Sequence, residues 1–154
     1  MLERAPRRIA EAAADLTPDQ LREAPEEGSW SVNEVLAHLR ACADMWGGAI
    51  ETILAEDYPT IRAVNPRTWI KQTDYPDLDF ESSFRAFRRQ RSELLATLHG
   101  IPEEAWNRAT LVTGAGKPIE RTLRGFANRI AIHERPHLKQ IERAASAVRG
   151  WRNP

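Results

Sequence analysis

The stretch WSVNEVLAHL at residues 30–39 marks the start of a helix and carries a histidine on it. Ser31 and Glu34 have the spacing of a capping box, in which each side chain binds a free backbone amide at the other's position. Apolar residues then recur at helical spacing, so we expect a helix that ends near Glu56. His38 lies at the border of the apolar stripe, where its side chain can still turn into the protein.

A pair of histidines lies near the other end of the chain, in the stretch HERPH at residues 133–137. On a helix running from about Thr122 to Val148, both imidazoles fall on the inward side. Buried imidazoles without partners are costly, so such a pair needs either hydrogen bonds or an ion. The four-residue spacing favours an ion. We therefore predict a metal site built from His38, His133 and His137.

Other residues offer alternatives to this ligand set. Each histidine could instead be a hydrogen-bonded core residue. His99 comes just before a glycine, where a histidine caps the end of a helix. Cys42 follows His38 by one turn and could close the site as a fourth ligand, although a buried cysteine is more often a small apolar residue.

Residues 133–137 also match the HExxH pattern of zinc proteases, in which the glutamate is a general base. Two features disfavour a protease. Pro136 lies inside the pattern, and the positions expected to complete a protease site hold Gln140 and Arg143. We expect Pro136 to kink the helix rather than end it. Glu134 falls within the apolar stripe and needs a partner, for which Arg91 is the candidate; an ion pair is favoured over a catalytic role.

Two further helices and two less regular segments are predicted in the rest of the chain. Apolar spacing predicts a first helix over residues 2–16 and a third over residues 80–98, stopped by Gly100. Residues 58–77 are proline-rich and read as a long crossover that walls a pocket, with Trp69 as a candidate lining residue. Residues 113–118 look like a loose turn between two extended pieces. An all-α fold with four helices is the economical interpretation.

Composition narrows the class of protein. The 154 residues fit one domain, residues 1–154, and 22 basic residues balance 22 acidic ones, which disfavours nucleic acid as a partner. A single cysteine allows no internal disulfide and agrees with a cytoplasmic location. No apolar run is long enough to span a membrane or to act as an export signal. The expected partner is a small-molecule substrate, and an apolar helix face also allows a homodimer.

The two histidine-bearing stretches together resemble the DinB-like superfamily, and the resemblance covers nearly the whole chain. It implies an up-down-down-up four-helix bundle with a long crossover between helices two and three. It also implies a divalent ion, nickel or zinc, held by His38, His133 and His137 with positions open for water or substrate. Characterised relatives look like thiol-dependent transferases that use bacillithiol, mycothiol or glutathione, and others were labelled metal-dependent hydrolases.

Three functions follow as hypotheses. The first is an enzyme in which the ion activates a low-molecular-weight thiol for transfer to a small electrophile. The second is a metal-dependent hydrolase with Glu134 as the general base. The third is a non-catalytic module that the ion stabilises and that binds a partner or small ligand.

Overall fold

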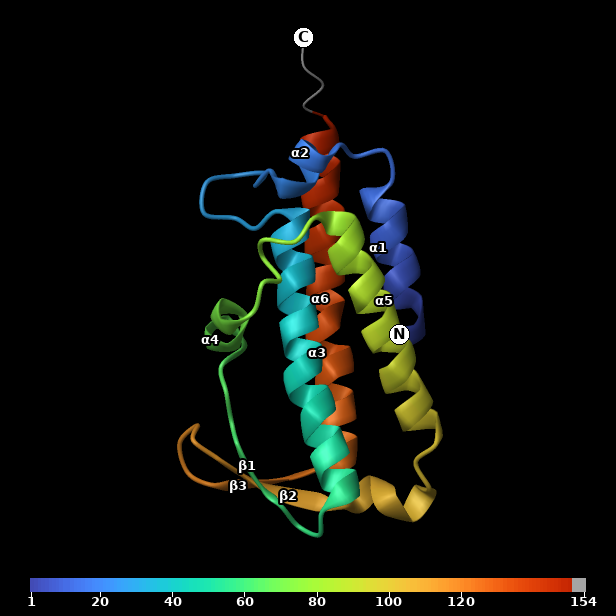
Figure 1. Cartoon of the computed structure of the whole chain (residues 1–154), viewed down its shortest axis with the longest axis vertical. Helices are drawn as coiled ribbons and strands as arrows, with labels where there is room; N and C mark the ends of the chain where they lie inside the picture. Colours follow the sequence, from blue (N-terminus) through green and yellow to red (C-terminus); the bar gives the residue numbers. More distant parts are fainter. Residues whose placement is uncertain (151–154) are drawn as a thin grey trace.

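Four long helices form the body of the protein in the computed structural model, which describes residues 1–150. They are α1 (Ala5–Ala13), α3 (Val32–Ala55), α5 (Phe80–His99) and α6 (Leu123–Arg149). Helices α1 and α6 run upward in Figure 1, whereas α3 and α5 run downward. The predicted up-down-down-up bundle is confirmed. No helix within residues 1–150 is long and apolar enough to cross a membrane.

Helix starts follow the capping signals in the sequence. The Glu34 amide donates to Ser31 Oγ at 3.2 Å, and the Ser31 amide donates to Glu34 Oε2 at 2.8 Å, so the capping box of α3 is confirmed. Thr17 caps the short helix α2 (Pro18–Arg22) in the same way. Helix α3 ends at Ala55, one residue before the expected end.

The long crossover between α3 and α5 is ordered into short elements. It contains β1 (Thr60–Arg62), α4 (Pro66–Trp69) and the 3₁₀ helix η2 (Ile70–Gln72). Tyr75 ties the segment to α3, because its hydroxyl donates to Asp44 Oδ2 at 2.7 Å and the Arg40 guanidinium lies 3.7 Å from its ring centroid. The crossover returns the chain to the top of the bundle, which is why α5 runs in the same direction as α3 (Figure 1).

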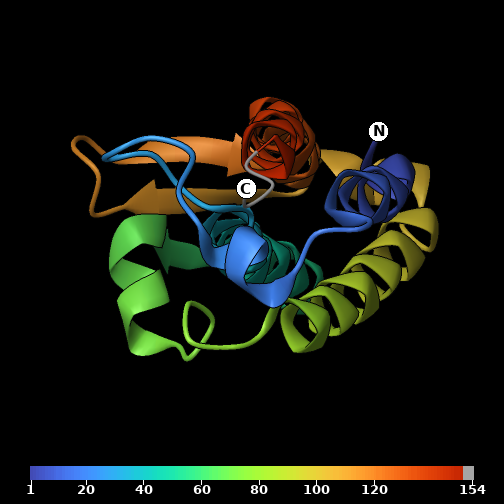
Figure 2. The ribbon, with the colours of Figure 1, turned by 90° about the horizontal axis from the view of Figure 1, so that it is seen from above.

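The fold is mostly helical, as expected, and carries in addition a small three-stranded sheet. Strand β1 pairs in parallel with β2 (Ala109–Thr113), and β2 pairs in antiparallel with β3 (Ile119–Thr122). The expected turn at residues 113–118 joins β2 to β3, and Gly114 and Gly116 take positive φ there. Figures 1 and 2 show that the hairpin extends to the same side of α3 as α4, away from α1 and α5. The 3₁₀ helices η1 (Leu2–Arg4) and η3 (Glu103–Asn107) complete the fold.

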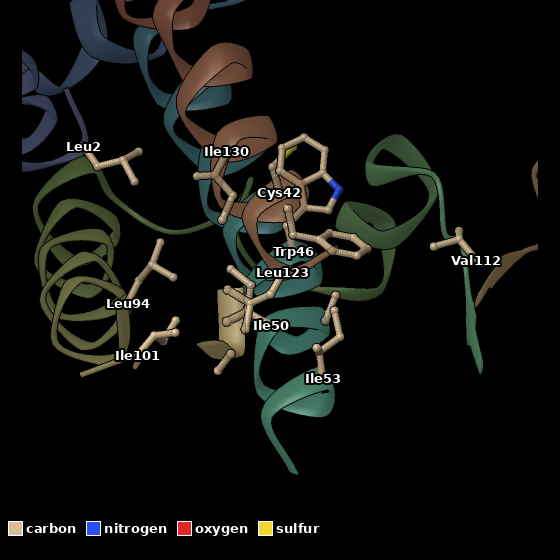
Figure 3. Packing of buried hydrophobic residues seen from close by; sticks show 13 residues of the cluster. Leu2, Cys42, Trp46, Ile50, Ile53, Leu94, Ile101, Val112, Leu123 and Ile130 are labelled. Atoms are coloured by element: carbon tan, nitrogen blue, oxygen red, sulfur yellow. The ribbon is translucent and has the colours of Figure 1, made fainter. Parts of the chain in front are cut away.

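Two clusters of buried apolar side chains hold the bundle. The lower one is shown in Figure 3, where Ile50 and Ile53 of α3 lie close to Leu123 of α6, and Leu94 of α5 faces them. The upper one joins α1, α3, α5 and α6 around Phe87, which is fully buried. Burial of each large side chain contributes about 1.5–3 kcal/mol, so these clusters supply most of the favourable free energy.

A buried ion pair joins α5 to α6. Arg91 Nη1 donates to Glu134 Oε2 at 2.8 Å and to Glu134 Oε1 at 3.0 Å, and it also donates to the Leu2 carbonyl at 3.2 Å. The two side chains are 3% and 2% exposed. The predicted partnership of Glu134 with Arg91 is confirmed. Burial raises the pKa of the Glu134 carboxyl, although Arg91 beside it acts in the opposite direction.

Helix α6 continues through Pro136 without interruption. Proline removes the amide that would bind the carbonyl of Ile132. Ile132 is 73% exposed and Pro136 is exposed as well, so this carbonyl lies on the solvent side of the helix. Water can satisfy it there, which explains how the helix tolerates the proline.

We expect Glu134→Ala to lower the free energy of unfolding by about 3–5 kcal/mol, because it leaves the Arg91 guanidinium buried without its counter-charge. The matched control is Glu142→Ala on the same helix. Glu142 pairs with Arg8 at 2.6 Å at the surface, where an ion pair contributes about 0–1 kcal/mol. Urea denaturation measures both. An equal decrease in the free energy of unfolding in the two variants would contradict the larger contribution expected of the buried pair.

Candidate metal centre

Three imidazole rings meet between α3 and α6. The ring centroids are 5.1 Å apart for His38 and His133, 4.7 Å for His38 and His137, and 4.5 Å for His133 and His137. His38 is turned inward, with 6% of its surface exposed. The four-residue spacing on α6 places His133 and His137 on one face, and the antiparallel packing of α3 brings His38 opposite them.

Cys42 also lies at this cluster. His38 Nε2 and His133 Nε2 are 3.3 Å apart, and Cys42 Sγ lies 3.5 Å from the first and 3.9 Å from the second. Donor atoms of His38, Cys42 and His133 all lie within 4.8 Å of one another, close enough to share an ion. The sequence offered only the one-turn spacing after His38 as a signal for this cysteine.

A hydrogen bond to Gln140 orients His137. Its Nδ1 lies 2.9 Å from Gln140 Oε1, and because an amide oxygen can only accept, Nδ1 carries the proton. The lone pair of Nε2 is then free to bind an ion. Histidine ligands of metals usually have such a partner at the second ring nitrogen.

The surroundings keep the imidazoles of His38 and His133 neutral. Burial, with the neighbouring histidines and arginine charges, lowers the pKa of His38 to about 4 and that of His133 to about 4. Burial raises the pKa of the Cys42 thiol to about 12. At neutral pH the two imidazoles therefore present free lone pairs, whereas the thiol keeps its proton unless an ion displaces it.

The donor set fits a divalent ion of borderline softness. Imidazole nitrogen suits zinc and nickel, and a thiol sulfur in addition favours zinc over the hard ions magnesium and calcium. Oxygen ligands of the kind that hard ions need are missing from the group formed by His38, Cys42 and His133. Which of the four side chains bind the ion stays a prediction.

A cavity of about 860 Å³ opens onto the rings. Its apolar wall includes Trp46, whose ring meets that of His133 edge-on at 4.8 Å between centroids. Trp69 of the crossover lines it, in line with the sequence analysis. A second space of about 690 Å³ shares four lining residues with this cavity, namely Trp30, His38, Arg67 and His137. The rings of Trp30 and His137 stack with centroids 6.2 Å apart.

Two candidate residues of the sequence analysis lie away from this centre. Glu134 follows His133 directly but faces α5, where Arg91 binds both of its oxygens. His99 is exposed in the last turn of α5, with Nε2 3.7 Å from Glu3 Oε1. The cavity has one acidic side chain among its described lining residues, Asp44. The proline-rich crossover supplies much of the cavity wall, as predicted, whereas the share of the wall that the strands supply was not predicted.

Comparison with known families agrees with this architecture. A family model described as the DinB superfamily matches residues 1–141. The chain therefore belongs to the DinB superfamily, as its two histidine-bearing stretches indicated.

Individual relatives extend the comparison. A Bacillus licheniformis protein named "Putative metal-dependent hydrolase" is 29% identical over 152 residues, which cover 97% of this chain and 84% of the relative. An Oceanobacillus iheyensis protein of the same name is 22% identical over 139 residues, 90% of this chain and 78% of the relative. The solved structure of YfiT from Bacillus subtilis, described as "a probable metal-dependent hydrolase with an unusual four-helix bundle topology", has a TM-score of 0.80 and 22% identity, covering 98% of this chain and 85% of that one.

We expect the protein, purified without a histidine tag or chelating resin, to carry about one divalent ion per chain. Mass spectrometry of the metals measures this. His133→Ala/His137→Ala should lose the ion, and His99→Ala, which changes a histidine outside the cluster, should retain it. Chelation should leave the helical circular dichroism in place, because the two apolar clusters do not need the ion. An ion content that survives in the double variant would contradict this assignment.

Low histidine pKa values also predict how stability changes with pH in the metal-free protein. Between the ordinary value of 6.5 and the folded-state value of about 4, the unfolded chain takes up protons at His38 and His133 that the folded chain does not. The free energy of unfolding should therefore decrease as the pH falls through this window. NMR of the imidazole carbons should show both rings neutral from about pH 8 to about pH 5.5. Protonation of either ring near pH 6.5 would contradict the low pKa values.

Proposed function

We propose that this protein is a metal-dependent hydrolase of a small molecule. The observation that carries the proposal is the cluster of three imidazoles, two of them with pKa values near 4, at the wall of a cavity large enough for a substrate. The names of the relatives in Bacillus licheniformis and Oceanobacillus iheyensis support the reaction class.

His38, His133 and His137 are the proposed ligands, and Cys42 is the neighbour that remains protonated. A divalent ion held by three neutral imidazoles would keep its full charge and supply Lewis acidity, which makes water or a thiol more acidic. Gln140 orients His137, and the indole rings of Trp30 and Trp46 exclude water from the sides of the cluster. The physiological ion in this proposal is zinc or nickel.

Hydrolysis also needs a group that takes and returns a proton, and the structure favours Asp44 over Glu134 for this task. Glu134 is 1% exposed and both of its oxygens bind Arg91, so it has no access to the cavity. Asp44 lines the cavity, where Tyr75 and Gln90 hold its carboxylate in place. An oriented carboxylate beside the substrate space is suited to general base catalysis.

Thiol transfer is the second candidate, and one observation favours it. The two spaces share the border formed by Trp30, His38, Arg67 and His137. A transferase must bind two molecules, a low-molecular-weight thiol and an electrophile, next to one activating centre. Two spaces that meet at the imidazoles provide this arrangement, whereas a hydrolase needs only one space and water.

The third hypothesis, a non-catalytic module, differs in what it requires of the ion. A structural ion is coordinatively closed, and its removal unfolds the domain. Here the imidazoles border open spaces, and apolar clusters pack on both sides of them along the bundle. This arrangement supports an exchangeable ion.

Activity of the metal-loaded protein on a panel of esters, amides and lactones tests the proposal. We expect Asp44→Asn to lower kcat by about 10²–10⁴-fold, the usual contribution of a positioned general base. Glu134→Gln should retain kcat when the rate is corrected for the folded fraction. Adding thiols to electrophiles in parallel reactions identifies transferase activity.

Two control variants separate chemistry from structure. Asp57→Asn removes an exposed carboxylate outside the cavity and should leave kcat unchanged. Tyr75→Phe removes the hydrogen bond to Asp44 but keeps the carboxylate, so it should retain most of the activity. If Tyr75→Phe is as inactive as Asp44→Asn, the role of Asp44 is to hold the crossover and not to move a proton.

A further inference from the structure

Four arginines line the cavity that opens onto the imidazoles. They come from four different elements: Arg62 from β1, Arg67 from α4, Arg121 from β3 and Arg129 from α6. One carboxylate, that of Asp44, lies among the described lining residues. Its oxygens already accept hydrogen bonds from Tyr75 and Gln90. The cavity therefore carries an excess of positive charge, although the whole chain has a formal net charge of zero.

These guanidinium groups have no anionic partner within residues 1–150. None of the four forms an ion pair or donates a side-chain hydrogen bond to the described part of the protein. Two of them lie over aromatic rings instead: Arg129 lies 5.2 Å from the centroid of Trp46, and Arg67 lies 5.8 Å from that of Trp30. Elsewhere Arg8, Arg91 and Arg124 each bind a glutamate. Stacking fixes the direction of a guanidinium while leaving its N–H groups free.

Part of this positive charge lies next to the histidine cluster. Arg129 comes one turn before His133 and so lies on the same face of α6. Its charge acts on His133 and Cys42, and the charge of Arg67 acts on His38, where each lowers the pKa. A molecule whose reacting bond lies at the imidazoles is thus within reach of at least one of these guanidinium groups.

The rest of the cavity wall is apolar. Trp46 and Phe126 from the bundle face Ile61 and Val112 from the sheet. Such a cavity fits a molecule with an apolar body and a charged end.

We infer that the substrate is a small apolar molecule bearing an oxyanion, a carboxylate or a phosphate, which Arg67 and Arg129 bind through their guanidinium forks. This inference rests on the proposed function, because it assigns the substrate class of the same site. The oxyanion orients the molecule in the cavity. The bond that is cleaved lies elsewhere in the molecule. Arginine matches the planar, two-pronged geometry of carboxylate and phosphate better than lysine does.

Calorimetric titration of the full chain after removal of metal tests the inference without any turnover. The probes are phenylacetate, phenylphosphonate and the uncharged phenylacetamide, which share one apolar body. We expect at least one anion to bind about tenfold or more tightly than the amide, and Arg67→Gln and Arg129→Gln each to weaken that binding by about tenfold. The anion that binds more tightly distinguishes a carboxylate from a phosphate substrate.

Arg135→Gln is the matched control. Arg135 lies on the same helix, close to the same histidines, and is exposed like Arg129, but it is outside the cavity lining. Its loss removes the same charge and should change anion binding by less than about twofold. Equal binding of amide and anions, no saturable anion binding at millimolar concentration, or an equal effect of Arg135→Gln would each overturn the inference.

The failure of this inference and that of the proposed function have different signatures. Selective anion binding by the metal-free protein, without hydrolysis after metal loading, would leave the inference standing and remove the hydrolase. Hydrolysis of uncharged substrates with the same kcat/KM in the native chain and in Arg129→Gln would keep the hydrolase and overturn the anionic substrate.

Discussion

The buried ion pair between Arg91 and Glu134 sets how α6 is rotated in the bundle, and the site depends on that rotation. Successive residues of a helix point about 100° apart. Once Glu134 faces α5 to meet Arg91, His133 and His137 are turned together toward α3, where His38 lies. The pair is almost fully enclosed, so water cannot replace the Glu134 carboxylate as the partner of Arg91. The pair therefore defines which face of α6 can carry ligands, whatever its net contribution to stability.

Local signals in the sequence were sufficient for the long helices, whereas their up-down-down-up order and the meeting of His38 with the pair on α6 were implied by the resemblance to the DinB-like superfamily. The capping box at Ser31 and the spacing of apolar residues depend on near neighbours only, and they predicted the start and end of α3 within one residue. The inward position of His133 followed from the same periodicity. The two extended pieces predicted around residues 113–118 are β2 and β3, but β1 and its pairing with β2 were not predicted, because β1 has three residues and pairs across about fifty residues of chain, from Thr60 to Leu111. Such pairing leaves no local pattern.

The crossover and Trp69 were expected to line a pocket, but the arginines of the cavity wall were beyond prediction for the same reason. Arg62 and Arg67 belong to a proline-rich segment without periodicity, and Arg121 belongs to a strand. The spacing of these three arginines in the sequence does not predict that they lie near Arg129. They share a cavity with it because the crossover and the hairpin fold onto one side of α3 (Figure 2). The equal numbers of acidic and basic residues in the whole chain also gave no sign of a cluster of arginines. A formal net charge of zero says nothing about a cavity where four guanidinium groups face one carboxylate.

The position of the imidazoles along the bundle separates the stability of the fold from the chemistry of the site. Ile50, Ile53 and Leu123 pack below the imidazoles, and Phe87, Leu138 and Ile141 belong to the separate cluster that also includes α1. The imidazoles lie between these two clusters and border open space. A domain that buries this much apolar surface does not depend on an ion to fold, unlike small metal-nucleated modules. The fold therefore does not depend on the side chains that line the cavity, namely the histidines, Asp44 and the four arginines. These side chains can serve to bind a ligand, although the arginines bring like charges together in one cavity.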